Sequence, residues 1–375
     1  MPIIFNNLSP KVLQNKILTF RVPGKAGTTV VGEMIESGPN KDLVSLGYKV
    51  VKEGKVLEEN SLGNKKGFPI NVVEDFSNRV QEKVKEGFNF LKEALGTRER
   101  GESMMLEQHI HGAFGVDFNK AEAEEISNVA DKLAERGIGA VFPTLVTDSV
   151  ANIKRQIERI KEAAKVNSRI LGIHLEGIFI NPKNKGIHNK KHLLEPSVKN
   201  FELLEDDFIK IVTLAPELDK GLIDYLRAKG VKVQAGHCSG WGNVDGVTHM
   251  FNAMSGVHHR NESTALSALL DKNVYTEVIA DGVHVNENSL NLLFMTKPVD
   301  KTILVSDALP ITHSNQKEAI FADSLIKYDG KQATSEEGTI AGSTMLLDEI
   351  VQRLKDINLF KPEYIENPWK YHGLG

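Results

Sequence analysis

The sequence has 375 residues, of which 41% are hydrophobic and 26% charged, so it can bury a core and is not that of a disordered chain. Its 46 lysines and arginines nearly balance its 50 aspartates and glutamates, and the net charge of −4 gives no electrostatic reason to expect nucleic acid or an anionic membrane as a partner. A single cysteine excludes an internal disulfide framework and a cysteine-based zinc cluster.

The N-terminus carries no recognisable targeting segment. Residues 1–7 lack the basic segment and the apolar run of a signal peptide. No stretch of the sequence approaches the roughly 18 consecutive apolar residues of a transmembrane helix. We therefore expect a cytoplasmic protein in a reducing compartment, with no membrane partner.

Residues 1–105 are predicted to form a separate region of short strands and one helix. Strands are expected at three places where β-favouring residues lie between glycine-rich turns: 16–22, 28–35 and 48–57. Residues 75–95 have apolar side chains at helical spacing, which predicts a long amphipathic helix with a core or docking face rather than a cofactor site. The lysine-rich segment 63–67 is predicted to be a solvated turn.

From residue 104 onward one pattern repeats, a short apolar run followed by an amphipathic segment. Eight runs predict strands: 104–109, 138–146, 169–176, 209–215, 231–237, 247–251, 274–279 and 302–307. Helices are expected at 121–136, 150–165, 218–229, 289–296 and 344–357. Strands that alternate with helices pair in parallel, and eight such units predict a closed (β/α)8 barrel, the TIM-like α/β fold, over residues 106–375.

All 12 histidines fall in this barrel part, and several end a predicted strand. In such a barrel the active site lies at the C-terminal ends of the strands. His109 and His111 share a strand face and could chelate one ion. One strand-end histidine alone is more often an ordinary buried or surface residue than a ligand. The ordered series of six ligand-type residues instead indicates a site for one or two divalent ions, with Glu176 placed to bridge: His109, His111, Glu176, His237, His249 and Asp307.

One further histidine and one glycine-containing segment lie near the predicted strand ends but are not predicted to bind the metal. His174 shares a strand face with Glu176, and we interpret it as a supporting residue or a substrate contact rather than a ligand. The glycine-containing segment 338–343 lies close to substrate in one interpretation. In the other, it shapes a turn before the last helix.

The barrel part carries ten short motifs, among them HIHGAFGVDF at 109–118, PTLVT at 143–147, GIHLEGIFINP at 172–182, THMFNAM at 248–254 and IADGVHV at 279–285. In this order they resemble the N-acetylglucosamine-6-phosphate deacetylase family of the amidohydrolase superfamily. The resemblance implies a barrel of the metal-dependent hydrolase type. It also implies hydrolysis of the acetamide of N-acetyl-D-glucosamine 6-phosphate to D-glucosamine 6-phosphate and acetate, in amino-sugar catabolism.

The resemblance implies a role for each member of the ligand series. Glu176, His237 and His249 match the family's constant metal ligands. His109 and His111 match a pair that some members use for a second metal. Asp307 matches the catalytic aspartate, which also ligates the metal. The implied cofactor is Zn, Mn, Fe or Co, with one or two ions per subunit.

Further residues match positions that contact substrate in the family. His188 matches a catalytic histidine that contacts the acetamide carbonyl, and His284 one that orients the sugar. Asn252 and Ala253 match a segment whose backbone contacts substrate. Arg260 matches an arginine that reaches the phosphate from the neighbouring subunit. The implied partners are therefore a sugar phosphate and a second copy of the chain in a homodimer.

The resemblance covers residues 104–375, and residues 1–105 carry none of its motifs. Ile178 stands where proline is usual, and segment 238–242 departs from the usual loop after the fifth strand. Two alternatives stay open at this point. One is an amidohydrolase that acts on another N-acyl amino sugar or on a cyclic amide. The other is a non-catalytic sugar-phosphate-binding protein whose first 105 residues carry the function, although the retention of every catalytic-type residue argues against it.

Overall fold

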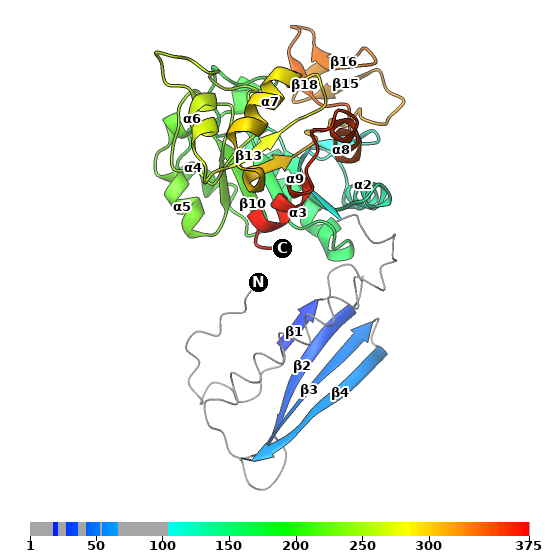
Figure 1. Cartoon of the computed structure of the whole chain (residues 1–375). Helices are drawn as coiled ribbons and strands as arrows, with labels where there is room; N and C mark the ends of the chain where they lie inside the picture. The colour runs from blue at the N-terminus through cyan, green and yellow to red at the C-terminus, as the bar shows by residue number, and fades with distance from the viewer. Residues whose placement is uncertain (1–17, 22–27, 37–42, 53–54, 67–103, 375) are drawn as a thin grey trace. The chain divides into compact units, whose positions relative to one another are not determined.

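The computed structural model describes residues 18–21, 28–36, 43–52, 55–66 and 104–374 (Figure 1). The chain divides into two compact units, Met1–Ser103 and Met104–Gly375. The assignment of residues 1–105 and 106–375 as separate functional domains stays a prediction. The helix predicted over 75–95 lies outside the described residues.

The described part of the first unit is a four-stranded antiparallel sheet. Its strands follow one another in chain order: β1 (Leu18–Arg21), β2 (Thr28–Glu36), β3 (Leu43–Lys52) and β4 (Lys55–Lys66). The single strand predicted over 48–57 is wrong, because Lys52 pairs with Lys55 and the segment belongs to two antiparallel strands. The predicted turn at 63–67 is also wrong over residues 63–66, which lie in β4. This strand is at the edge of the sheet, where lysines are well tolerated.

The second unit is built on eight parallel strands, one at each position predicted for the barrel. They are β5 (Met105–Ile110), β8 (Ile138–Leu145), β9 (Ile173–Glu176), β10 (Ile209–Leu214), β11 (Lys232–Ala235), β12 (Gly246–Val247), β13 (Tyr275–Val278) and β14 (Thr302–Leu304). The segment after β14 returns to β5, where His111 N–H donates to Ala308 O at 2.9 Å and Asp307 N–H donates to His109 O at 2.8 Å. These bonds close the sheet, and the predicted TIM-like barrel is confirmed.

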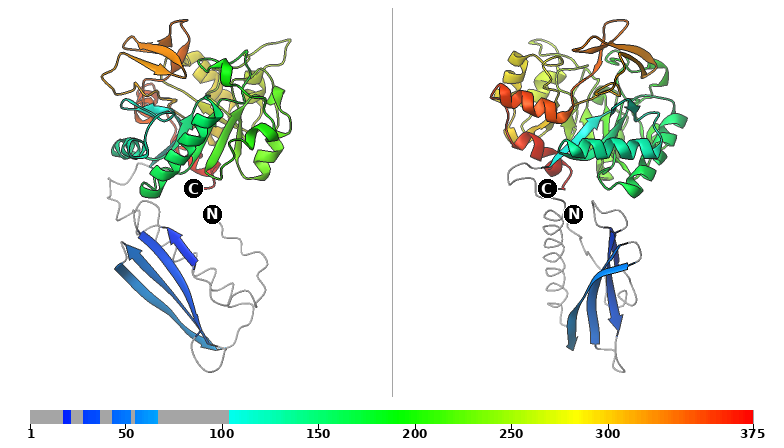
Figure 2. Two further views of the ribbon diagram at one scale, coloured as in Figure 1. Left: turned by 180° about the vertical axis from the view of Figure 1, so that it is seen from behind. Right: turned by 90° about the vertical axis from the view of Figure 1, so that its right-hand side faces the viewer.

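Helices surround the barrel (Figure 2). They are α2 (Ala123–Glu135), α3 (Val150–Val166), α4 (Val198–Phe201), α5 (Leu222–Ala228), α6 (Thr264–Leu270), α7 (Glu287–Thr296), α8 (Leu347–Asp356) and α9 (Glu363–Tyr371), with short 3₁₀ segments at Lys190–His192, Pro216–Leu218 and Val299–Lys301. In α2, Ile126, Val129, Ala130 and Leu133 are buried at helical spacing, so one stripe of the helix packs on the barrel. In the part of the chain that the structure describes, no helix combines the length and the apolar character needed to cross a bilayer.

Two small antiparallel sheets add to the barrel. One is the pair β6 (Gly112–Ala113) and β7 (Val116–Asp117). The other, at the upper right of the barrel in Figure 1, contains β15 (Glu318–Phe321), β16 (Ser324–Tyr328), β17 (Ala333–Ser335) and β18 (Ile340–Gly342). The second sheet was not predicted, because its strands have three to five residues and alternate little in hydrophobicity. It buries an apolar cluster of its own that includes Phe321 and Ile326.

Candidate metal centre and active site

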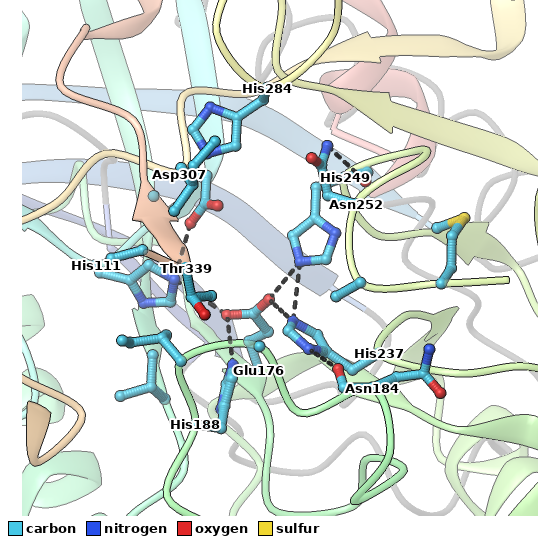
Figure 3. A pocket seen from close by; sticks show the side chains of 18 of the residues that line it. His111, Glu176, Asn184, His188, His237, His249, Asn252, His284, Asp307 and Thr339 are labelled. Atoms are coloured by element: carbon cyan, nitrogen blue, oxygen red, sulfur yellow. Dashed lines mark hydrogen bonds and ion pairs between the residues drawn. The ribbon is translucent and has the colours of Figure 1, made fainter. Parts of the chain in front are cut away.

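Glu176, at the end of β9, lies between His111 on one side and His237 and His249 on the other (Figure 3). Its Oε1 is 3.2 Å from His237 Nε2 and 2.9 Å from His249 Nε2. Its Oε2 is 3.0 Å from His111 Nε2 and 3.5 Å from His109 Nε2. All five side chains are buried. Each oxygen of one carboxylate therefore faces its own histidine pair, which is an arrangement suited to a bridging ligand.

Asp307 joins the group on the side of the first pair. Its Oδ1 is 3.0 Å from His111 Nε2 and 3.4 Å from His109 Nε2. The candidate ligand atoms of these three residues and of Glu176 all lie within 4.8 Å of one another. We call the full set the strand-end cluster: His109, His111, Glu176, His237, His249 and Asp307.

Three atoms of the strand-end cluster are buried without a well-aligned hydrogen bond among the described residues. They are His109 Nε2 and Asp307 Oδ1, which lie 3.4 Å apart, and His249 Nδ1, the ring nitrogen other than the one that contacts Glu176. Buried polar atoms are nearly always paired, so such orphaned atoms need an explanation. On the other side of Glu176, His237 Nε2 and His249 Nε2 lie only 3.0 Å apart. A cation would account for the orphaned His109 Nε2 and Asp307 Oδ1 and for the close approach of His237 to His249. Imidazole and carboxylate are the donors that Zn²⁺ and similar ions take. The residues present therefore fit a divalent metal.

Three members of the cluster have a left-handed backbone conformation. The φ angles are 49° at His237, 27° at His249 and 52° at Asp307. Such a conformation is uncommon for residues with a side chain and costs on the order of 1–3 kcal/mol each. Each residue stands where the chain leaves a barrel strand. Backbone strain thus coincides with the positions of three candidate ligands, as is typical of functional sites.

Beneath the cluster, Glu277 of β13 orients His109. Its Oε2 lies 3.0 Å from His109 Nδ1, and its Oε1 accepts hydrogen bonds from Gln108 Nε2 at 2.6 Å and Gln234 Nε2 at 3.1 Å. Burial opposes ionisation, but His109 and these hydrogen bonds lower the pKa of Glu277 to about 2. The carboxylate therefore holds the proton of His109 on Nδ1 and leaves Nε2 free as a ligand atom.

Glu277 was missed in the sequence, although a signal for it exists. It is the one charged residue in the strand sequence YTEV, and it is only 1% exposed. A carboxylate inside a buried strand needs a partner, which makes it a candidate supporting residue. His174 lies beside His109, with ring centroids 4.6 Å apart, and its Nε2 is 2.7 Å from Thr213 Oγ1. Burial and the charge of His109 lower the pKa of His174 to about 3, so His174 is neutral.

The strand-end cluster opens into a cavity of about 340 Å³, a volume at the lower end of the range for small-molecule sites. Four residues predicted to contact substrate line it: His188, Asn252, Ala253 and His284. Arg260 does not line it and is exposed in the segment 256–262. Other lining residues, among them Lys183, Asn184 and Phe321, were not predicted from the sequence. Segment 338–343 is near the site, since 339–342 line the cavity, and its end forms β18 rather than a turn.

The two cavity histidines outside the cluster each have a fixed partner. His188 Nδ1 lies 2.8 Å from Thr147 Oγ1, and its Nε2 lies 3.8 Å from Glu176 Oε2. Burial, together with the charge of His237, lowers the pKa of His188, which is therefore neutral. His284 Nδ1 lies 2.8 Å from Asp281 Oδ2. Both rings are therefore held from the side of Nδ1.

Comparison with known proteins supplies the family. No protein-family model matches the sequence. An N-acetylglucosamine-6-phosphate deacetylase of Rattus norvegicus is 30% identical over 279 residues, which cover 66% of this chain and 68% of the relative. The chain belongs to the N-acetylglucosamine-6-phosphate deacetylase family.

Two further relatives of this deacetylase family extend the comparison. An N-acetylgalactosamine-6-phosphate deacetylase of Escherichia coli O157:H7 is 27% identical over 274 residues, or 68% of this chain and 72% of the relative. The crystal structure of N-acetylglucosamine-6-phosphate deacetylase from Thermotoga maritima has a TM-score of 0.69 at 23% identity, and the match covers 88% of this chain and 86% of that one. The family and the barrel fold therefore agree with the resemblance carried by the motifs.

Proposed function

We propose that the protein hydrolyses the acetamide of N-acetylglucosamine 6-phosphate, releasing glucosamine 6-phosphate and acetate in amino-sugar catabolism. The observation that carries this proposal is the buried Glu176 carboxylate with a histidine pair on each oxygen and Asp307 beside it. The family to which the chain belongs supports the same reaction. The single cysteine, which is buried and free, supports a cytoplasmic setting.

The strand-end cluster would hold one or two divalent ions. His109, His111, Glu176 and Asp307 would hold one ion, and Glu176, His237 and His249 would hold the other. Nitrogen and oxygen donors suit Zn, Mn, Fe and Co alike. When bound, such an ion lowers the pKa of a water molecule from about 15.7 toward 7 and stabilises developing negative charge.

Asp307 would move the proton of the reaction. Its carboxylate takes the proton from the water that attacks the acetamide carbon, and then gives it to the nitrogen as the carbon–nitrogen bond breaks. A new carbon–oxygen bond forms in acetate, and the sugar leaves as a free amine. An acetamide nitrogen is a poor leaving group unless it is protonated, so both halves of this proton transfer are needed.

The remaining cavity residues would bind and orient the substrate. His188 faces the strand-end cluster and would donate a hydrogen bond to the acetamide oxygen, where negative charge develops. His284, Asn252 and Ala253 would contact the sugar. Among the described residues that line the cavity, Lys183 is the one lysine or arginine. Its positive charge would attract the phosphate.

Arg260 would act on the phosphate of a second copy of the chain. It is exposed and does not line the described cavity of its own chain, which is consistent with a role across an interface. Its planar guanidinium can bind phosphate with two parallel hydrogen bonds, whereas a lysine acts as a point charge. We therefore include a homodimer in the proposal.

Substrate turnover is the direct test. Metal-free protein is supplied separately with Zn²⁺, Mn²⁺, Fe²⁺ and Co²⁺ and incubated with N-acetylglucosamine 6-phosphate, and acetate and free amine are measured. Unphosphorylated N-acetylglucosamine is the matched control, because it has the same amide and lacks the phosphate. We expect release of both products in equal amounts from the phosphorylated sugar. Absence of turnover with every ion would contradict the proposal.

The Asp307→Asn variant tests the proton transfer. Asparagine keeps the shape and one oxygen but cannot accept the proton, so we expect a loss of about 10²- to 10⁴-fold in kcat. Metal content, measured by mass spectrometry, should stay comparable to that of the wild type. If the variant retains activity close to the wild-type value, Asp307 is not the proton carrier.

A second candidate substrate is N-acetylgalactosamine 6-phosphate, the epimer at C4. The relative from Escherichia coli O157:H7 that carries its name matches the chain over a similar length. The ratio of kcat/KM for the two sugars decides between them, since both carry the same acetamide and phosphate. Tight binding of either sugar phosphate without hydrolysis would instead support a non-catalytic binding protein.

A further inference from the structure

Thr147, which follows β8, contacts the part of His188 that faces away from the cavity. Its Oγ1 lies 2.8 Å from His188 Nδ1 and 2.7 Å from the backbone nitrogen of Ile178. The backbone nitrogen of Thr147 also lies 3.4 Å from His188 Nδ1. All three residues are at most 2% exposed, so bulk water does not compete for these contacts.

The donors and acceptors in this group can be assigned one by one. The backbone N–H of Ile178 can only donate, so Thr147 Oγ1 accepts from it. The hydroxyl has one proton of its own to donate, and His188 Nδ1 is its acceptor among the described contacts of Thr147. The backbone N–H of Thr147 also points at Nδ1 and can only donate. Nδ1 must therefore carry a lone pair, and the neutral ring carries its proton on Nε2.

The position of this proton decides what His188 can do. Its Nε2 faces Glu176 Oε2 at 3.8 Å, and the ring lines the cavity. By position alone, His188 groups with Glu176 and His237 as a candidate metal site. A neutral ring protonated on Nε2 has no lone pair there for a metal, but it has a hydrogen-bond donor for an oxygen.

The backbone around Thr147 leaves space for this contact at the cost of strain. Gly177 has a φ of +107°, and a Cβ there would come within 2.4 Å of Thr147 Oγ1 and 2.6 Å of His188 Nδ1. Ile178 has a φ of 57°, an unfavourable value for a β-branched residue, and its N–H is directed at Thr147. Proline, which the family resemblance leads one to expect at this position, has no N–H to donate.

We propose that Thr147 is a positioning residue that holds His188 in the tautomer protonated on Nε2, so that His188 is a hydrogen-bond donor in the cavity and not a metal ligand. The oxygen that it would face, that of the substrate acetamide, rests on the function proposed above. The tautomer itself does not depend on that function.

The test compares Thr147→Val with Thr147→Ser. Valine keeps the shape and removes the hydroxyl, whereas serine keeps the hydroxyl. The backbone N–H that remains in the valine variant is 3.4 Å from Nδ1, longer than the usual range of about 2.7–3.2 Å, so it holds the tautomer more weakly than the hydroxyl does at 2.8 Å. ¹⁵N spectra of protein labelled in its histidine rings report which nitrogen carries the proton, and a His188→Gln variant assigns the signals. We expect one Nε2-protonated form of His188 in the wild type and in Thr147→Ser, and a loss of this single form in Thr147→Val.

Kinetics and metal content supply independent readouts. With N-acetylglucosamine 6-phosphate we expect kcat to fall roughly 10- to 100-fold in Thr147→Val, with KM within about threefold. The reason is that a His188 ring without a fixed Nε2 proton stabilises the developing oxyanion less well, whereas substrate binding depends less on this hydrogen bond. Thr147→Ser should stay within about threefold of the wild type in both constants. His188→Gln should keep the wild-type metal content, whereas His249→Gln should reduce it.

Several outcomes separate this proposal from the alternatives. An unchanged His188 spectrum in Thr147→Val, or a loss of metal in His188→Gln, would overturn it. If the wild type shows the Nε2-protonated form but hydrolyses no sugar phosphate, the proposed function fails while the tautomer assignment stands. Thermal unfolding identifies a variant that does not fold, and Thr147→Ala, which removes the same hydroxyl, then takes the place of Thr147→Val.

Discussion

At the scale of single residues, a chain of buried hydrogen bonds determines which nitrogen of His109 carries its proton and which faces the candidate metal site. Glu277 Oε2 contacts His109 Nδ1, while Glu277 Oε1 accepts hydrogen bonds from the side-chain amides of Gln108 and Gln234. These amides cannot reverse freely, because Gln234 Oε1 accepts from Thr248 Oγ1 at 2.8 Å and Gln108 Oε1 lies 3.2 Å from His372 Nε2. The barrel interior thus requires an acceptor-only side chain at position 277.

The Glu277→Gln variant tests this requirement. The new amide would direct its oxygen at the two glutamine NH₂ groups and its own NH₂ at His109 Nδ1, which leaves the proton of His109 on Nε2, where the metal would bind. We expect metal affinity to fall about 10- to 100-fold, measured by competition with a chelator. Thr276→Val on the same strand is the matched control, since Thr276 Oγ1 is buried without a partner among the described residues. Equal affinity in wild type and Glu277→Gln would show that Glu277 does not orient the ligand.

The strand-end ligand candidates and the residues that orient them differ in how well they can be predicted from the sequence. The strand-end histidines could be predicted because each directly follows an apolar run, and the barrel brings the ends of parallel strands together. Thr147 lies in a recognised motif, but its contact with His188 depends on how the chain folds back 41 positions later. Glu277 lies inside a strand rather than at its end, so the rule that identified the candidate ligands did not identify it.

At the scale of elements, the loop after β13 is fixed by one carboxylate. Asp281 Oδ1 accepts hydrogen bonds from the backbone N–H groups of Val283 and His284, both at 2.9 Å. Its Oδ2 receives His284 Nδ1 and the hydroxyl of Ser343, which follows β18. Asp281 therefore ties two loops together at the cavity. Asp281 lies in the sequence motif IADGVHV at 279–285, but its link to Ser343 could not be predicted, because the sheet that contains β18 was not predicted.

The pKa of Asp281 makes this link sensitive to acid. Burial opposes ionisation, but the hydrogen bond and the charge of His284 lower the pKa of Asp281 from 3.8 to about 2. Because the folded pKa is below the unfolded one, the stabilisation is complete above the unfolded value and is lost as the pH falls through about 2. A shift of this size corresponds to about 2 kcal/mol in the free energy of unfolding.

We expect Asp281→Asn to lower the free energy of unfolding by about 2 kcal/mol near pH 7, and the difference from the wild type to narrow below about pH 4. Urea unfolding at both pH values measures this. Asp348→Asn is the control, because Asp348 pairs with the half-buried Arg136 near the surface and should cost less than about 1 kcal/mol. A difference that does not depend on pH would mean that Asp281 acts through shape and not through its charge.

At the scale of the whole molecule, all candidate site residues lie in one of the two compact units. The unit Met104–Gly375 contains the strand-end cluster and the cavity, and the unit Met1–Ser103 contains no histidine. The barrel could be predicted because eight apolar runs recur along the chain, with amphipathic segments between several of them. The first unit could be predicted only in part, since the single strand expected over 48–57 covers the end of β3 and the start of β4.

This division predicts that residues 104–375 fold and bind metal without the first unit. We expect a fragment that begins at Met104 to unfold in one cooperative thermal transition and to have the metal content of the full chain. The midpoint temperature of that transition should rise when Zn²⁺ or Mn²⁺ is added. Circular dichroism and metal analysis on the fragment and on the full chain provide the comparison. An unfolded fragment, or a folded one without metal, would show that the first unit is needed to build the site.

The left-handed backbone at His237, His249 and Asp307 has a consequence for protein engineering. Glycine adopts this conformation without strain, so replacing one of these residues by glycine relieves a local cost of about 1–2 kcal/mol while removing a candidate ligand. A library selected for heat resistance alone, in the absence of metal, would therefore enrich inactive variants at these positions. Selection for stability in this barrel has to be coupled to metal binding or turnover, because at these strand ends a less strained backbone comes with the loss of a candidate ligand.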